Sequence, residues 1–211
     1  MIVGLSFETM NTIAKDKHEA LAGVAASVFL QRGIEEATIK EIATRLGVGE
    51  ATIYRHYRTK TRLAILAANY LQQEIMASYF NDIVVGTGIN GLRAFYNVFA
   101  SVYEHNPEYY RFLDQFDVFV ASSESNEKFA YEEGLDRFKD IYLTLYKKGL
   151  EDGTVNEIED IESFYFATTH ATLSLCKKLA SQSVIAQDLV IDKAKELKVF
   201  VETVLYRLER R

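Results

Sequence analysis

A single proline in 211 residues is the feature that most constrains how this chain can fold. Proline lacks a backbone donor and breaks helices, so a chain with one proline leaves long helices uninterrupted. Apolar residues recur every three or four positions through most of the sequence, which is typical of amphipathic helices. No alternating pattern typical of strands is sustained. The sequence therefore predicts an all-α fold.

The composition indicates in which cellular compartment the protein works and which classes of protein are excluded. Hydrophobic residues make up 48% of the chain and charged residues 26%, which is enough apolar material for a core. The single cysteine cannot form a disulfide within the chain and favours a reducing compartment, so we expect a cytoplasmic protein. No stretch approaches the ~20 apolar residues that a membrane span needs. The first residues, 1–14, have no basic start to an apolar run and do not resemble a secretion signal.

The apolar spacing and the turn residues predict a division into three parts. We expect an amino-terminal extension over residues 1–15, a three-helix domain over 16–62, and a larger helical domain over 63–211. In the small domain the expected helices span about 16–32, 39–46 and 50–57, and a long connecting helix follows from Lys60 to about residue 80. The larger domain has expected helices over about 89–105, 107–120, 131–149, 160–180 and 186–210.

Local signals mark the ends of the first helices. Gly33 is placed to close the first helix, and Thr38 with Glu41 forms a capping-box pattern at the start of the second. Residues 47–49, Gly-Val-Gly, interrupt the chain before the third helix, and Thr59 is placed to cap the fourth. Two short helices separated by a glycine-containing turn, over residues 38–57, have the layout of a helix-turn-helix.

The charge distribution agrees with a nucleic-acid contact at that motif. The whole chain carries a net charge of −6, but residues 38–62 hold six basic and two acidic residues, a local charge of +4. A basic patch on an acidic body suits a protein that touches a polyanion with one face. The outward face of the third helix offers arginine for base edges and threonine and tyrosine for bases and phosphates.

Residues 38–63, TIKEIATRLGVGEATIYRHYRTKTRL, resemble the DNA-binding domain of the TetR family of transcriptional regulators. The resemblance implies a helix-turn-helix head, a connecting fourth helix, and an all-helical domain for ligand binding and dimerisation. It also implies that six residues contact DNA: Lys40, Thr52, Tyr54, Arg55, His56 and Lys60. Two positions depart from the family pattern. Gly49 stands where a capping serine is frequent, and Glu50 places a carboxylate close to the DNA.

Two other patterns in the sequence bear on whether the chain is an enzyme. Residues 86–91, Gly-Thr-Gly-Ile-Asn-Gly, match a dinucleotide-binding pattern, but that site needs a βαβ unit and the following residues are helical. None of the four histidines belongs to a Glu-x-x-His pair, the usual ligand pattern of helical metal sites. We therefore predict no enzymatic activity, no metal and no cofactor.

Aromatic residues point to a small-molecule site in the larger domain. Residues 90–170 contain 17 of the 26 phenylalanine and tyrosine residues of the chain. Many of these rings must belong to the core, but apolar pockets with a few polar groups are also the usual ligand sites. The residues that we expect to line an effector pocket are Phe99, Tyr103, Phe116, Phe138, Tyr142, Tyr165 and His170. Asp114 and Asp117 would favour a cationic ligand if they faced inward, but aspartate is mostly exposed.

The last two helices predict a dimer. The helix over 186–210 has a broad apolar stripe, Val190, Ala194, Leu197, Val201, Val204, Leu205 and Leu208, and a further apolar side chain at Phe200. Phe164, Tyr165 and Phe166 follow one another in the preceding helix, so they cannot all face inward. A helix that is apolar on more than one side buries the remainder against a partner. We expect a homodimer through these two helices and a palindromic operator.

These features together predict a ligand-responsive transcriptional regulator, with a repressor as the expected form. It would bind a double-stranded operator as a dimer and leave it when a small lipophilic effector binds. The alternative is a helical metabolite-binding protein or enzyme that carries a vestigial DNA-binding head.

Overall fold

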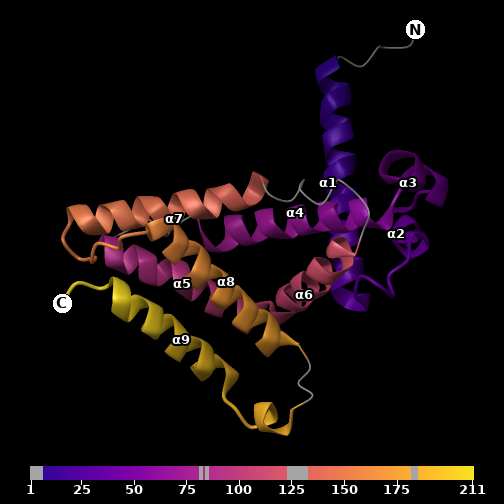
Figure 1. Cartoon of the computed structure of the whole chain (residues 1–211). Coiled ribbons are helices and arrows are strands. Elements are labelled where there is room, and N and C mark those ends of the chain that lie inside the picture. Colours follow the sequence, from indigo (N-terminus) through magenta and orange to yellow (C-terminus); the bar gives the residue numbers. More distant parts are fainter. Residues whose placement is uncertain (1–6, 81–82, 84–85, 123–132, 182–184) are drawn as a thin grey trace. The chain divides into compact units, whose positions relative to one another are not determined.

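The computed structural model describes residues 7–80, 83, 86–122, 133–181 and 185–211 of the chain, and these residues are almost entirely helical (Figure 1). The elements are α1 Phe7–Arg32, α2 Ile39–Leu46, α3 Glu50–Tyr57, α4 Lys60–Tyr79, α5 Gly88–His105, α6 Pro107–Ala121, α7 Glu133–Glu151, α8 Ile161–Ala180, a short 3₁₀ helix η2 Ala186–Leu189, and α9 Lys193–Leu208. Extended pairing within the described residues is limited to one bridge, between Val155 and Glu209. The predicted all-α fold is confirmed.

The chain packs as two compact units. The first comprises residues 1–72 and 115–131, and the second comprises residues 73–114 and 132–211. Two helices are therefore divided, because α4 and α6 each contribute residues to both units. The predicted domain boundary after residue 62 remains a prediction.

In the first unit, α1 begins earlier than the sequence indicated. The helix starts at Phe7 rather than near residue 16, because residues 7–15 contain neither glycine nor proline to interrupt it. It ends where expected, at Gly33, whose φ of +82° places it in the left-handed region. The Gly33 N–H donates to the Phe29 carbonyl over 2.8 Å, which closes the last turn.

The capping box at the start of α2 is half formed. The Thr38 hydroxyl accepts a hydrogen bond from the Glu41 N–H at 3.1 Å, as expected. The Glu41 carboxylate pairs instead with Arg45 at 3.0 Å and with Arg32 at 3.5 Å. The Glu41 side chain, which the capping-box pattern directs back to the start of α2, instead links α2 to α1 through Arg32.

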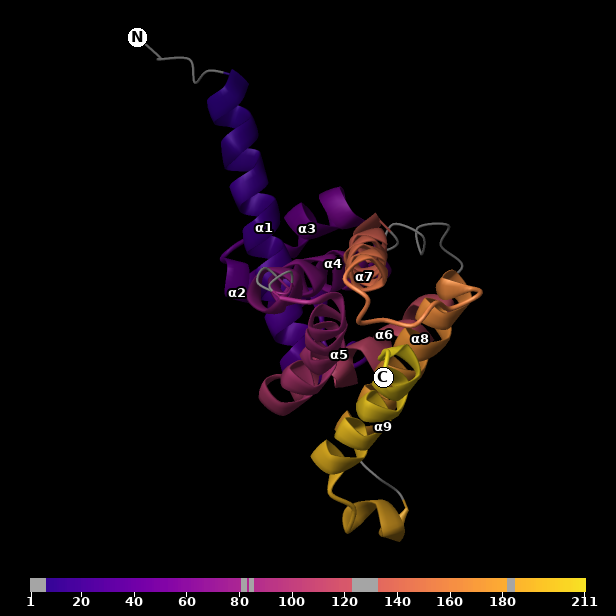
Figure 2. The same ribbon diagram turned by 90° about the vertical axis from the view of Figure 1, so that its left-hand side faces the viewer.

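In the second unit, α5 packs against α7, α8 and α9, and α8 lies beside α9 (Figures 1 and 2). The stripe predicted on the last helix is partly used here, since Leu197, Val201, Val204, Leu205 and Leu208 are buried within the chain. The expected helix over 186–210 is divided, which corrects the prediction. The Asp192 carboxylate accepts from the Lys195 N–H at 3.0 Å and starts α9 at Lys193.

The helix α7 begins at Glu133 and ends at Glu151, two residues beyond the predicted end. The predicted start of this helix at residue 131 lies outside the described residues. Among the helices that the structure describes, none combines the length and the hydropathy needed to cross a membrane.

Candidate nucleic-acid interface

Two short helices in the first unit, α2 and α3, are joined by a tight turn. Gly47 takes a φ of +70°, and the Val48 N–H donates to the Ala43 carbonyl at 3.0 Å. Ile42 and Ala43 of α2 and Ile53 of α3 are buried. Because these apolar residues anchor one side of each helix, the opposite sides are left at the surface.

The exposed side of this helix pair carries five of the six residues predicted to contact DNA. They are Lys40 of α2 and Thr52, Tyr54, Arg55 and His56 of α3. Within the described residues, the side chains of Lys40 and Arg55 form no ion pair, so their donors are available to an anion. The tyrosine side chain at 54 is 49% exposed although it is large and largely apolar. This surface can donate hydrogen bonds to base edges and phosphates.

The start of α3 is as weakly capped as the sequence indicated. Gly49 precedes the helix and makes no side-chain cap, although its carbonyl accepts from the Thr52 N–H at 2.9 Å. Glu50 is exposed in the first turn, where a carboxylate is favourable to the helix dipole.

A contact not expected from the sequence holds the end of α3 against α1. The Tyr57 hydroxyl and Nδ1 of His18 are 2.6 Å apart, and burial raises the pKa of Tyr57 above its ordinary value. Sequence reasoning missed this contact, because the two residues lie 39 positions apart in the chain.

The chain between α3 and α4 is strained at Arg58. Its φ of +54° is the one positive value at a non-glycine residue in the described part of the chain. The Thr59 hydroxyl then accepts from the Arg62 N–H at 3.2 Å, which confirms the predicted cap of α4. This sharp change of direction sets the position at which α4 begins, with Lys60 as its first residue.

Lys60, the sixth predicted DNA contact, lies differently from the other five. Its ammonium donates to the Glu35 carbonyl at 2.6 Å and lies 5.8 Å from the centre of the Phe119 ring. The side chain is half-buried. Desolvation lowers the pKa of Lys60, and the nearby carboxylates of Glu35 and Glu36 oppose that shift.

Four of the predicted effector-pocket residues, Phe99, Phe138, Tyr142 and Tyr165, belong to one aromatic cluster in the second unit. Phe95 is at its centre, with ring centres 5.3 Å from Tyr142 and 6.0 Å from Phe99. Tyr165 contacts Tyr142 at 5.0 Å, and Phe138 joins through Phe80 at 4.9 Å. Most of these rings meet edge to face or tilted, the arrangement that aromatic pairs favour.

The polar groups of the aromatic cluster are unequally satisfied. The Tyr96 hydroxyl and the Thr168 hydroxyl are 2.7 Å apart and share a hydrogen bond. The Tyr142 hydroxyl is fully buried, and among the described residues it has no partner within hydrogen-bonding geometry. Burial, and then the neighbouring Tyr96, raise the pKa of Tyr142 strongly. Burial also raises the pKa of Tyr165 to about 12, so all three hydroxyls remain protonated and neutral at ordinary pH.

The other predicted pocket residues lie outside the aromatic cluster. The half-buried Tyr103 donates to the Leu179 carbonyl at 3.4 Å, and Phe116 is buried in the first unit rather than the second. His170 is exposed on α8 with its ring 5.7 Å from that of Phe166. Asp114 and Asp117 are both exposed.

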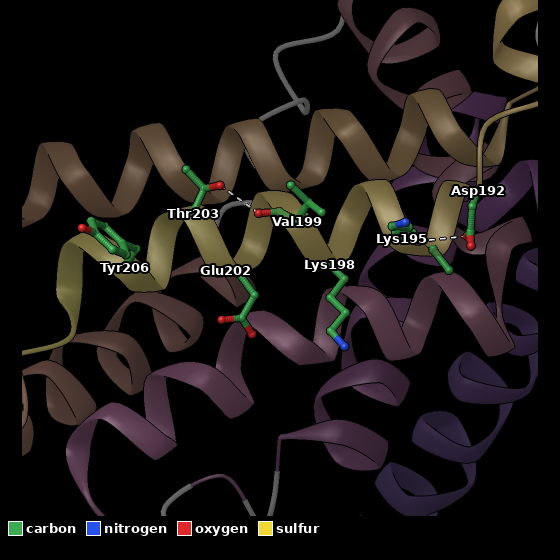
Figure 3. A pocket seen from close by; sticks show the side chains of 8 residues that line it. Asp192, Lys195, Lys198, Val199, Glu202, Thr203 and Tyr206 are labelled. Carbon is green, nitrogen blue, oxygen red and sulfur yellow. Dashed lines mark hydrogen bonds between the residues drawn. The ribbon is translucent and has the colours of Figure 1, made fainter.

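The outer surface of α9 forms a shallow groove (Figure 3). Its lining residues are Asp192, Ala194, Lys195, Lys198, Val199, Glu202, Thr203 and Tyr206. Val199 is 58% exposed and Tyr206 is 62% exposed, although both are large and largely apolar. The Glu202 carboxylate accepts from Arg93 of α5 at 2.8 Å, which fixes one edge of the groove. In the described part of the chain, no group of three His, Cys, Asp or Glu residues is arranged to hold a metal ion.

Two short helices joined by a tight turn, with one side of the second exposed, give the first unit the layout of helix-turn-helix domains, a class that binds DNA. Residues 22–67 match the family model described as bacterial regulatory proteins of the tetR family. This match confirms the resemblance to the TetR family that the sequence indicated for these residues.

Comparisons over more of the chain agree. The chain is 22% identical over 149 residues to the transcriptional repressor KstR2 of Rhodococcus jostii, covering 67% of this chain and 69% of that protein. The solved structure of the ketosteroid transcriptional regulator KstR2 of Mycobacterium tuberculosis has a TM-score of 0.60 at 17% identity, covering 92% of this chain and 95% of that one. The transcriptional regulator FadR of Bacillus subtilis, solved in complex with stearoyl-CoA, has a TM-score of 0.65 at 16% identity and covers 89% and 97%.

These similarities show that the chain shares the fold of these solved regulators over 92% and 89% of its length, with a helix-turn-helix head and a helical second domain. The relatives named above are all described as transcriptional regulators or repressors.

Proposed function

We propose that this chain is a ligand-responsive transcriptional repressor that binds a palindromic operator as a homodimer and is released by a small lipophilic effector. The observation that carries the DNA-binding part is the exposed outer side of α3, anchored from beneath by the buried Ile53. Such a protein acts where the DNA is, in the cytoplasm, and needs no cofactor.

The residues of the DNA-binding surface divide into two roles. Arg55 can make paired hydrogen bonds to a guanine, and Thr52 offers a hydroxyl and a methyl to a base edge. Lys40, Tyr54 and His56 suit phosphate and sugar contacts, which fix the position of the head without selecting sequence. Lys60 would add a phosphate contact at the start of α4.

The experiment that tests DNA binding measures fluorescence anisotropy on DNA from upstream of the protein's own gene and on random DNA, across a salt series. Arg55→Ala should weaken operator binding by ~1–3 kcal/mol and weaken random binding less, because one base is no longer recognised. Arg137→Ala, which removes the same charge from an exposed position on α7, should leave both affinities nearly unchanged.

Equal losses in Arg55→Ala and Arg137→Ala would contradict a base contact by Arg55. If the wild-type protein binds ligands but no DNA at any salt concentration, the chain is instead a metabolite-binding protein with a vestigial head.

The dimer part of the proposal is supported by the outer faces of α8 and α9. Phe166, Val199 and Tyr206 are large and at least 43% exposed in the single chain. Small side chains, Ala167 and Ala171, are exposed beside Phe166 and would let a partner helix approach closely. Pairing α8 and α9 of two chains would bury these surfaces in a four-helix bundle and relate two α3 helices by a two-fold axis.

The effector part is supported by the aromatic cluster of the second unit, with its unpaired Tyr142 hydroxyl. A ligand that entered among these rings would meet mostly apolar surface and one hydroxyl that lacks a partner. The stearoyl-CoA in the FadR structure carries a long apolar acyl chain, and the ketosteroid in the description of KstR2 belongs to a largely apolar class of molecules. They support a lipophilic effector for this chain.

Stearoyl-CoA is a direct probe of the effector proposal. If it binds and releases the protein from DNA, its own affinity must fall by the same factor when DNA is present. Tyr142→Ala should reduce this response and leave DNA affinity without ligand nearly intact. Loss of DNA binding in Tyr142→Ala with unchanged ligand binding would show that the ring belongs only to the core.

A further inference from the structure

The carboxyl-terminal end of α6 belongs to the first unit and lies against the turn between α1 and α2. Two side chains of α6, Gln115 and Phe119, make contacts in this region. They are four residues apart and therefore share one side of the helix. The ammonium of Lys60, the first residue of α4, lies over the Phe119 ring. The five other predicted DNA contacts are exposed, whereas this lysine is half-buried.

Gln115 forms a hydrogen bond with the turn between α1 and α2. Its Oε1 accepts a hydrogen bond from the Ile34 N–H at 2.9 Å, and Ile34 is completely buried. A buried N–H needs an acceptor, so this bond fixes the chain at residue 34. Gly33 permits the approach, since a Cβ on that residue would lie 3.0 Å from the same oxygen. The carbonyl of the next residue, Glu35, is thereby held at a defined position.

That carbonyl is the acceptor for Lys60. The Lys60 Nζ donates to the Glu35 oxygen at 2.6 Å, and the same ammonium lies over the Phe119 ring at 5.8 Å from its centre. An ammonium is attracted to the negative face of an aromatic ring. The carboxylates of Glu35 and Glu36 further favour the charged form of Lys60. The carbonyl and the ring hold the ammonium in place, although partial burial lowers the pKa of Lys60.

We propose that Lys60 is a latch that DNA must open: in the free protein its ammonium is held by the Glu35 carbonyl and the Phe119 ring, and a DNA phosphate competes with both for the same charge. This inference rests on the proposed DNA-binding function and adds its regulation. The end of α6, which bears no predicted DNA contact, thereby sets the affinity of the head for DNA.

The test removes the ring and keeps the lysine. Phe119→Leu retains an apolar side chain without a π face, and Phe119→Met does the same with a more flexible one if leucine disturbs folding. Either variant should bind DNA more tightly than the wild type by about two- to five-fold, because opening the latch then costs less. The gain should be equal for operator and random DNA, since phosphate contacts carry no sequence information. Phe119→Tyr keeps the ring and should retain wild-type affinity.

The dependence on Lys60 is the decisive part. Lys60→Met alone should weaken binding to all DNA and reduce the salt slope by about one phosphate contact. In the Lys60→Met background, Phe119→Leu should have no further effect, because the charge for which ring and phosphate compete is gone.

Several results would overturn the latch. One is that Phe119→Leu and Phe119→Met bind DNA no more tightly than the wild type. Another is that they bind more tightly by the same factor with and without Lys60. In both cases the wild type still binds DNA, so the proposed function is retained and only the latch proposal is rejected. If the wild type binds neither operator nor random DNA, the proposed function fails and the latch fails with it.

Discussion

Two tyrosine hydroxyls in the aromatic cluster show how much one polar atom matters in a dry core. Tyr96 and Tyr142 are both completely buried, and their rings are 6.1 Å apart. Tyr96 shares a hydrogen bond with Thr168, whereas the Tyr142 hydroxyl has no partner in hydrogen-bonding geometry within the described part of the chain. A buried hydroxyl without a partner loses its bonds to water and gains nothing in return.

Substituting phenylalanine at each position should therefore have opposite effects. Tyr142→Phe should raise the free energy of unfolding by up to about 1 kcal/mol, because it removes the unsatisfied group. Tyr96→Phe should lower it by about 1 kcal/mol, because it removes a satisfied one. Urea unfolding followed by circular dichroism measures both. A loss of stability in Tyr142→Phe would show that its hydroxyl is satisfied in solution, for example by water.

At the scale of elements, the contact between the start of α5 and the end of α7 is unusually close. A Cβ on Gly88 would overlap the backbone of Gly149, and backbone cannot yield as a flexible side chain can. The carboxylate of Asp152, just beyond α7, accepts from the Gly88 N–H at 2.7 Å. The hydrogen bond therefore joins the start of α5 to the end of α7, and the lack of side chains on Gly88 and Gly149 permits their close approach.

Gly88→Ala should consequently destabilise the protein by ~1–3 kcal/mol or more, since overpacking here must separate α5 from α7. The matched control is Gly23→Ala in α1, where a Cβ would lie 3.4 Å from the Tyr70 ring, an ordinary contact distance. That change should be neutral or stabilising by up to about 1 kcal/mol, because alanine favours a helix interior over glycine. Equal effects in a thermal denaturation experiment would contradict the close approach of the two helices.

At the scale of the whole molecule, the chain by itself leaves apolar side chains exposed along α8 and α9. Phe166 of α8 and Val199 and Tyr206 of α9 have no cover within the described chain comparable to that of Leu197 or Leu205. Burial of such surface between two chains is the proposed basis of the dimer, and the dimer would set the spacing between two recognition helices.

The dimer is tested by placing a charge in the α9 groove. Val199→Lys should shift the sedimentation coefficient at micromolar concentration from that of a dimer to that of a monomer, because burying an unpaired charge is costly. Val118→Lys on α6 is the control, since Val118 is 69% exposed and lies outside the proposed interface. A wild-type protein that sediments as a monomer would exclude this interface and the palindromic operator.

Much of the architecture was determined by sequence signals that act over three or four residues. The helix periodicity, the left-handed Gly33, the Thr38 and Thr59 caps and the turn at Gly47 are local, and each is found where it was predicted. They fix the helix-turn-helix because the hydrogen bonds involved join near neighbours in the chain. The extension of α1 to Phe7 and the break between η2 and α9 were missed, since residues 7–15 carry no cap and residues 186–192 no strong helix breaker.

Only the tertiary structure decided which partner each side chain found. Lys60 faces the Glu35 carbonyl and the Phe119 ring, Tyr57 meets His18, and the Glu41 carboxylate joins α2 to α1. Phe116 and Phe138, predicted for one pocket, fall in different compact units. These outcomes depend on how helices distant in the sequence pack. Periodicity shows that a helix has a buried side, but it does not show which helix covers it.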